Sequence, residues 1–277
     1  MKYSNWTKGT ALVILLPFFV ASCSTGKYAA TNKVYKKQAK EFANTLKASP
    51  PLNQEITTLG EDRQGWVGSV NFGIRKPNFV VLHHTAQQST DETVRTFTLA
   101  RTQVSAHYVV GRDGNVVQMV NDYLRAQHAG VAKWGNDTDL NSSSIGIEID
   151  NNGNEPYSGE QIKSLLELLA GLKKKYNIPT ANFIGHADVA PTRKPDPNQF
   201  PWKVLAEKGY GFWYDKVLLM PPVNFDTTLA LRIIGYDIKN LSAAIVAFKR
   251  HFVQTDITPT LTPADKLILF NLYKKYL

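Results

Sequence analysis

One short segment of the chain, residues 185–197, contains many ionisable residues and three prolines. It reads GHADVAPTRKPDP. Each proline fixes its own φ, supplies no N–H and biases the residue before it toward extended geometry, so we expect a stiff loop without helix or inner strand. The loop carries a histidine, two acids and two cations: His186, Asp188, Arg193, Lys194 and Asp196.

A second set of ionisable residues lies outside this loop. It comprises His83, His84, His107, His128 and Glu148. A zinc site for hydrolysis needs three protein ligands and an open position for water. A histidine at a strand end, with a histidine and an aspartate from the stiff loop, would meet that need. The residue types alone leave open whether Asp188 or Asp196 completes the set, and whether the histidines are instead structural and hydrogen-bonded.

Several other catalytic designs are excluded by missing motifs. The sequence has no H-E-x-x-H zinc helix, no G-x-S-x-G serine elbow and no glycine-rich phosphate loop. Its single cysteine, Cys23, precedes the folded part, which excludes a cysteine nucleophile there and any intramolecular disulfide.

The middle of the chain predicts a mixed α/β domain. FVVLHH (79–84) and SSIGIEID (143–150) have strand composition, and residues 105–120 predict a hairpin around Gly114. Helices are predicted after the capping boxes Ser89/Glu92 and Ser158/Gln161. Strands interleaved with helices indicate a mixed central β-sheet with packed helices.

The end of the chain predicts a small three-helix domain. Its third helix is expected to begin with Thr262 as N-cap and Pro263 at the first helical position. We therefore expect a catalytic domain at 71–210 and a helical domain at 211–277.

The start of the chain predicts export and membrane attachment. Residues 1–22 combine lysines with a short apolar run, as a signal peptide does, and the run is too short to span a membrane. Val20-Ala21-Ser22-Cys23 resembles a bacterial lipoprotein box, which implies acylation, including palmitate, on Cys23. Ser24 after that cysteine implies sorting to the outer membrane, facing the periplasm. Residues 23–70 would then be a tether, in which NKVYKKQAK is polar enough for a linker or a frayed helix.

The net charge is modestly positive, at +9, and removal of the two lysines in residues 1–22 leaves +7. Such an excess favours anionic partners. Predicted export, and the lack of an arginine-rich run or an RNP-like aromatic motif, argue against nucleic acid.

Five ordered motifs resemble a known family. They are VVLHHTA, SAHYVVGRDGNVVQMV, HAG, LNSSSIGIEID and GHADVAPTRKPDP. Their order and spacing are similar to those of the zinc-dependent N-acetylmuramoyl-L-alanine amidases, the AmpD and T7 lysozyme type, which share a fold with peptidoglycan recognition proteins. The resemblance covers about residues 71–205. It implies one Zn²⁺ ion and peptidoglycan or muropeptides as substrate, and we expect a monomer.

The resemblance also implies roles for individual residues. His83, His186 and Asp196 fall on the zinc ligands, with Asp188 left to brace the loop. Glu148 falls on the catalytic glutamate and Lys194 on the catalytic lysine. His128, in QHAG where the family has WHAG, and Asn141 are candidates for substrate contact.

The tail resembles a peptidoglycan-binding domain more weakly. Ile234-Gly235-Tyr236 and residues 243–248 fit that pattern, whereas Lys249 replaces its usual glutamine. Two other functions remain possible at this level, namely a recognition lipoprotein that binds muropeptides without cutting them and a purely structural lipoprotein. The presence of all five matched site residues favours the enzyme.

Overall fold

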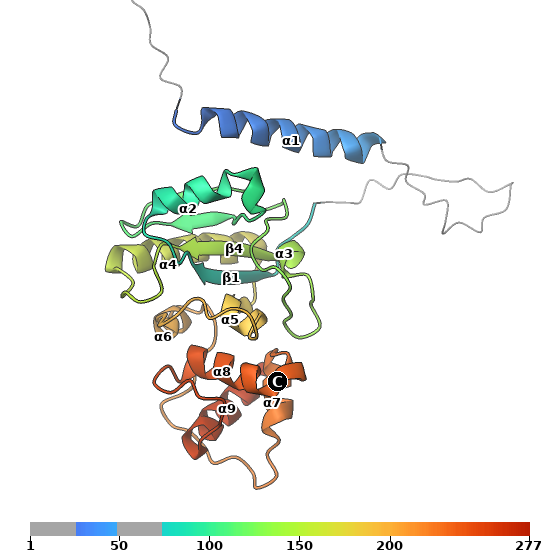
Figure 1. The fold of residues 1–277 in the computed structure, drawn as a ribbon. Helices are drawn as coiled ribbons and strands as arrows, with labels where there is room; N and C mark the ends of the chain where they lie inside the picture. Colours follow the sequence, from blue (N-terminus) through green and yellow to red (C-terminus); the bar gives the residue numbers. More distant parts are fainter. Residues whose placement is uncertain (1–25, 49–73) are drawn as a thin grey trace, which may run out of the picture. The chain divides into compact units, whose positions relative to one another are not determined.

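The computed structural model describes residues 26–48 and 74–277. The chain divides into two compact units, residues 1–69 and 70–277. The predicted signal peptide and Cys23 lie outside the described residues. Within the first unit the described part is a single helix, α1 (Ala29–Ala48), and none of its residues is buried (Figure 1). No helix in the described ranges is long and apolar enough to cross a membrane.

The second unit is built on one five-stranded mixed sheet, as predicted. Its strands run in the order β3-β2-β4-β1-β5. They are β1 (Phe79–His84), β2 (Tyr108–Val110), β3 (Val116–Gln118), β4 (Ser144–Ile149) and β5 (Phe183–Gly185). β1 is central and pairs in parallel with both β4 and β5. β2 is parallel to β4, whereas β2 and β3 form the predicted antiparallel hairpin, with Gly114 at φ 80° in its turn.

The helices form where the sequence caps them. Ser89 caps α2 (Thr90–Phe97) and Ser158 caps α4 (Gly159–Tyr176), each by accepting a backbone N–H from the third residue of its helix. The remaining segments of the α/β part are α3 (Leu140–Ser143), α5 (His186–Val189), α6 (Trp202–Glu207) and the 3₁₀ turns η1 (Ala100–Thr102) and η2 (Thr180–Asn182).

Strand alternation separates two apolar cores. Val80 and Leu82 of β1 and the isoleucines of β4 face one way and pack against the leucines of α4. Val81 of β1 and Ile184 of β5 belong to the other cluster, with α5 and the C-terminal helices. The side chains of β1 therefore pack into both cores. Their direction alternates along the strand as far as its last two residues, His83 and His84.

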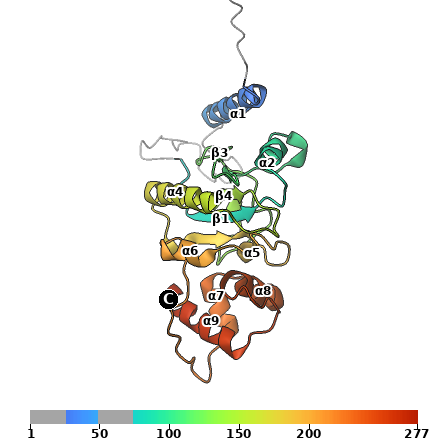
Figure 2. The same ribbon diagram turned by 90° about the vertical axis from the view of Figure 1, so that its left-hand side faces the viewer.

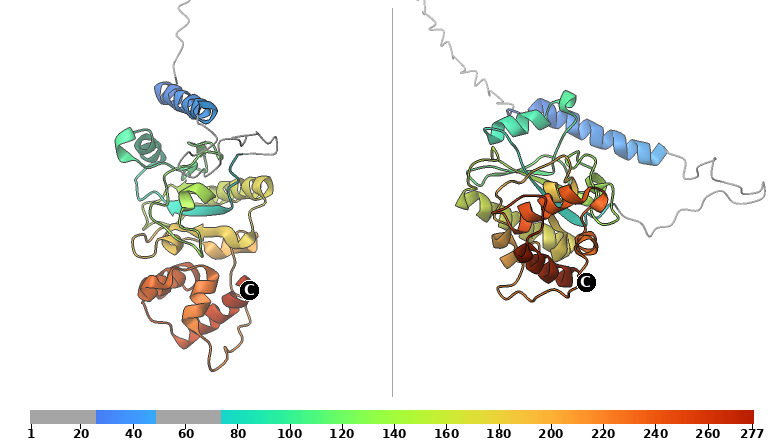
Figure 3. Two further views of the ribbon diagram at one scale, coloured as in Figure 1. Left: turned by 90° about the vertical axis from the view of Figure 1, so that its right-hand side faces the viewer. Right: turned by 60° about the horizontal axis from the view of Figure 1, so that its bottom comes forward.

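The predicted C-terminal helices are α7 (Thr227–Ile234), α8 (Leu241–Phe252) and α9 (Pro263–Tyr276), with η3 (Ile238–Asn240) before α8. Thr262 caps α9 as expected. In Figures 1 and 2, and in the left view of Figure 3, α5 and α6 lie between the sheet and these helices. Residues 70–277 form one compact unit by their contacts, and a functional boundary near residue 210 stays a prediction.

One local prediction was wrong. The loop 185–197 was expected to contain no helix, but its first residues form the helical turn α5. The three prolines all follow this turn, so they leave its N–H groups in place and restrict only the chain beyond it.

Candidate active site

Three predicted ligands converge at the carboxyl end of the parallel strands. His83 lies in β1, His186 opens α5 directly after β5, and Asp196 ends the proline-rich loop. All three side chains are buried. Because parallel strands end at the same edge of a sheet, His83 and the residue that follows β5 lie close together without any contact along the sequence.

The ligand atoms of this triad form a small triangle. His83 Nδ1 lies 2.9 Å from His186 Nδ1 and 3.2 Å from Asp196 Oδ2, and His186 Nδ1 lies 3.0 Å from Asp196 Oδ2. Tetrahedral zinc bonds of about 2.0–2.1 Å place ligand atoms about 3.3 Å apart. The triangle therefore fits one zinc ion after only a small expansion. In the described residues this is the group of histidine and carboxylate side chains spaced to hold a metal ion.

Protonation in the site also suits a divalent cation. Burial, reinforced by His186, lowers the pKa of His83 to about 4, so its ring is neutral at physiological pH. Burial alone would raise the pKa of Asp196, but the two histidine rings beside it, His186 and His83, bring it well below its usual range. A neutral imidazole and an ionised carboxylate are the forms that bind metal.

A hydrogen-bond chain fixes the tautomer of His83. Ser144 Oγ donates to the carbonyl oxygen of Leu140, which can only accept. Ser144 Oγ must then accept from His128 Nε2, at 3.1 Å, which leaves His128 Nδ1 to accept from His83 Nε2, at 3.0 Å. The lone pair of His83 is thereby directed from Nδ1 toward Asp196.

His186 is oriented in the same way by backbone. Its Nε2 donates to the carbonyl oxygen of Ala129 at 3.1 Å, so its Nδ1 also presents a lone pair to the triad. Such outer contacts are typical of histidines that bind metal.

His128, a predicted substrate-contact residue, lies behind His83, with 9 % of its surface exposed and both ring nitrogens bonded to protein. Asn141 is buried too, and its Oδ1 accepts the backbone N–H groups of His128 and Ala129. Substrate contact by either residue stays a prediction. In the structure, His128 and Asn141 both shape the loop beside His83.

Sequence reasoning did not single out Ser144 and Gly146. A Cβ atom at Gly146 would lie 2.3 Å from the His128 ring, so only glycine leaves room for the ring against β4. Glycine inside a strand often marks such a close approach, and this was the available signal.

Glu148 stands beside His83 on the neighbouring strand, and the two residues are direct partners in the pairing of β1 with β4. Its Oε2 is buried and has no hydrogen-bond partner among the described residues. Burial, and then the negative charge of Asp196, raise the pKa of Glu148 well above its usual range, and the ammonium of Lys194 acts in the opposite direction. A carboxyl oxygen that is buried without a partner is costly, and such a cost is typical of a group kept for proton transfer.

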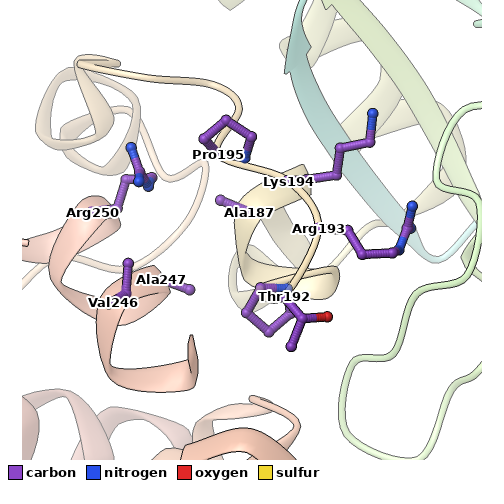
Figure 4. Close-up of a pocket in the computed structure, with 9 residues that line it drawn as sticks. Ala187, Thr192, Arg193, Lys194, Pro195, Val246, Ala247 and Arg250 are labelled. Atoms are coloured by element: carbon purple, nitrogen blue, oxygen red, sulfur yellow. The ribbon is translucent and has the colours of Figure 1, made fainter. Parts of the chain in front are cut away.

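Lys194 is exposed and reaches from the loop toward the strands of the sheet (Figure 4). Arg193 donates to the carbonyl oxygens of Ala129 and Val131. A pocket between this loop and α8 shares Lys194 with the site, but the metal triad does not line it.

His84 and His107 are held in structural contacts. His84 Nδ1 accepts the backbone N–H of Asn198, away from the triad, as strand alternation predicts. His107 is buried, and its Nδ1 accepts the N–H of Gly146.

Asp188, expected to brace the loop, connects α5 to the C-terminal helices. Its Oδ2 accepts the backbone N–H of Gly185 and Nδ1–H of His251, each at 2.7 Å, and its Oδ1 accepts from the Tyr236 hydroxyl at 2.8 Å. His251 itself stacks on Trp202. Every oxygen of Asp188 is thus used inside the protein, which leaves Asp196 as the acid of the triad.

Comparison with known proteins gives a consistent result. The family model described as N-acetylmuramoyl-L-alanine amidase (Amidase_2) matches residues 73–199. The N-acetylmuramoyl-L-alanine amidase AmiD of Escherichia coli is 32% identical over 230 residues, which cover 71% of this chain and 82% of AmiD. The 1,6-anhydro-N-acetylmuramyl-L-alanine amidase AmpD of Haemophilus influenzae is 39% identical over 103 residues, which cover 36% of this chain and 56% of AmpD.

Solved structures extend the likeness beyond the family model. A complex of E. coli AmiD with the substrate anhydro-N-acetylmuramic acid-L-Ala-D-gamma-Glu-L-Lys has a TM-score of 0.65 at 30% identity, covering 81% of this chain and 97% of AmiD. AmpDH3 of Pseudomonas aeruginosa has a TM-score of 0.66 at 29% identity, covering 79% of this chain and 99% of its own. With its motifs, its fold and the similarity to AmiD over most of both sequences, this chain belongs to the Amidase_2 family of N-acetylmuramoyl-L-alanine amidases.

Proposed function

We propose that this protein hydrolyses the amide bond between the lactyl group of N-acetylmuramic acid and L-alanine in muropeptides, using one zinc ion held by His83, His186 and Asp196. The observation that carries this proposal is the convergence of three ligand atoms within 4.8 Å of one another beside Glu148, whose buried Oε2 has no hydrogen-bond partner among the described residues. The substrates named for AmiD and AmpD support the choice of bond.

Different residues of the chain have different roles in the proposed reaction. Zinc at the triad would supply Lewis acidity, which polarises a carbonyl group and lowers the pKa of water. Glu148 accepts the proton of the attacking water and then delivers it to the departing alanine nitrogen. The Lys194 ammonium stabilises the negative charge that develops on the amide oxygen.

A recognition protein without catalysis is the alternative, and Glu148 argues against it. Binding alone gains nothing from a buried carboxylate without a partner, since such a group lowers the stability of the fold.

The cellular setting completes the proposal. Acylation of Cys23 would attach the enzyme to the outer membrane facing the periplasm, where peptidoglycan fragments are found, and the C-terminal helices would bind glycan. The enzyme would act as a monomer. Support for the anchor comes from the lipoprotein box of the sequence.

Variants at two positions separate metal binding from catalysis. Asp196→Ala should lose zinc and turnover together, because the only carboxylate of the triad is removed. Glu148→Gln should keep stoichiometric zinc and muropeptide binding while turnover falls by about 10²–10⁴-fold, the usual contribution of a general base. Zinc content by atomic absorption and turnover by chromatography are the readouts. A Glu148→Gln protein of near-normal rate would remove the proton-transfer role.

A further inference from the structure

Helix α1 has two chemically different faces. Tyr35, Ala39, Phe42 and Leu46 recur at intervals of four, three and four residues, which places them in one stripe along the helix. Phe42 is 57% exposed and Leu46 is 81% exposed. An apolar stripe of this width normally lies against a partner.

The other side of the helix is cationic. The helix contains five lysines and one acid, Glu41, so it carries a net charge of +4. Lys37 pairs with Glu41 at 3.8 Å on the surface. At helical spacing the lysines gather on the side away from the apolar stripe: Lys33, Lys36, Lys37, Lys40 and Lys47.

From these two faces we propose that α1 is an interfacial helix that lies in the surface of an anionic lipid bilayer, with its apolar stripe among the acyl chains and its lysines at the phosphate groups. Aromatic and leucine residues opposite a lysine face, with low overall hydropathy, are typical of helices that lie on a membrane and do not cross it. The charge of the lysine face complements anionic phospholipid and would add to the attraction.

The position of the helix supports a lipid partner over a protein one. It begins six residues after Cys23, the predicted acylation site. Six extended residues span at most about 20 Å, so an acyl group on Cys23 would hold the start of α1 at the bilayer surface. A single acyl chain binds membranes weakly, and a basic amphipathic helix is the kind of second signal that makes attachment stable. The inference is independent of the amidase activity.

The test uses the unacylated chain of residues 24–277, so that the helix is the attachment under study. Sedimentation with vesicles of phosphatidylethanolamine and phosphatidylglycerol should pellet the protein, and vesicles of phosphatidylcholine should pellet much less. High salt should weaken the binding, because it screens charges at the surface.

Paired variants then identify the face that binds. Phe42→Gln with Leu46→Gln should lower partitioning by about tenfold or more, because two large apolar side chains no longer leave water. Val34→Gln is the matched control, since Val34 is 56% exposed on the same helix but lies off the stripe. Muropeptide hydrolysis should be equal in all of these proteins.

Three results would overturn the proposal. The first is no binding to anionic vesicles. The second is equal binding by the stripe variant, which would leave only a charge effect. The third is sedimentation as a dimer, or with purified peptidoglycan, that depends on Phe42 and Leu46 in the absence of vesicle binding, which would assign the stripe to another partner.

Discussion

His128 contacts His83, a proposed zinc ligand, and should act on the metal through it. The series of hydrogen bonds that begins at Ser144 fixes the donor and acceptor at each step. The contact with His128 therefore determines which nitrogen of His83 keeps a lone pair. His128→Ala should therefore weaken zinc binding by about 10–100-fold, the usual effect of losing such an outer contact. Titration against a chromogenic chelator measures this affinity directly.

A conservative variant separates this positioning role from simple packing. His128→Gln provides a carbonyl oxygen that can accept from His83 Nε2, so it should recover part of the zinc affinity lost in His128→Ala. Equal zinc affinity in the wild type and a folded His128→Ala protein would contradict the proposed role.

Glu148 should make the metal-free protein sensitive to alkaline pH. Its pKa is raised in the folded state, mainly by burial, so the neutral form fits the fold and the ionised form does not. The contribution of Glu148 to the free energy of unfolding is fully present below the pKa that this residue has in the unfolded chain. It is lost as the pH rises through the higher pKa of the folded state. In chelated samples, Glu148→Gln should therefore melt at least about 2 °C higher than wild type at pH 8.

The same comparison at low pH is the control. Near pH 4 the carboxyl group is protonated in the folded protein, so the two melting temperatures should converge. A difference that is constant from pH 4 to pH 8 would show that the substitution acts through packing and not through ionisation.

Most of the candidate site could be predicted from residue types and family motifs. The convergence of His83, His186 and Asp196 is an example. Three features did not follow. The roles of Ser144 and Gly146, and the buried position of His128, depend on how β4 packs against the 127–129 loop, and local sequence carries little information on such contacts.

Helix α5 carries His186, a proposed zinc ligand, and is itself held by the C-terminal helices. Asp188 of α5 accepts hydrogen bonds from Tyr236, just beyond α7, and from His251 of α8. Next to Tyr236, Gly235 packs against a different residue: it has φ 134°, and a Cβ there would lie 2.3 Å from the Trp134 ring. The C-terminal segment thus braces the loop that presents His186.

Tyr236→Phe should loosen this brace. It removes one donor to a buried carboxylate, which should lower the free energy of unfolding by about 1–3 kcal/mol. Zinc affinity should also fall, because α5 positions His186. Thermal melts and zinc titration are the measurements.

Tyr273→Phe is the matched control for that variant. Tyr273 lies in α9 and its hydroxyl has no hydrogen-bond partner within the described ranges, so the loss should be small. A Tyr236→Phe protein as stable as Tyr273→Phe would mean that Asp188 does not need the C-terminal helices.

The sequence predicted the elements well because caps and periodicity are local. Ser89, Ser158 and Thr262 begin helices where expected. Helix α5 was not predicted, because the three prolines of residues 185–197 argue against a helix. All three, however, follow the helical turn. The docking of Tyr236 and α8 on α5 was not predicted, because it depends on contacts between residues 48 and 63 positions apart in the sequence.

In the whole molecule, the second unit combines a candidate metal site with helices that brace it, and the first contributes a cationic amphipathic helix. The strands and loop that build the site come from distant parts of the sequence, so the site exists only in the folded chain. The lipoprotein box and α1 together predict an enzyme that works at a membrane surface on nearby cell-wall fragments.

The most direct test of the central claim is hydrolysis of purified muropeptides by residues 24–277, with products identified by mass. Release of intact stem peptide beginning at L-alanine is expected, and it should be lost on chelation and restored by zinc. Binding without cleavage by a folded, zinc-loaded protein, or cleavage unaffected by complete removal of metal, would contradict it.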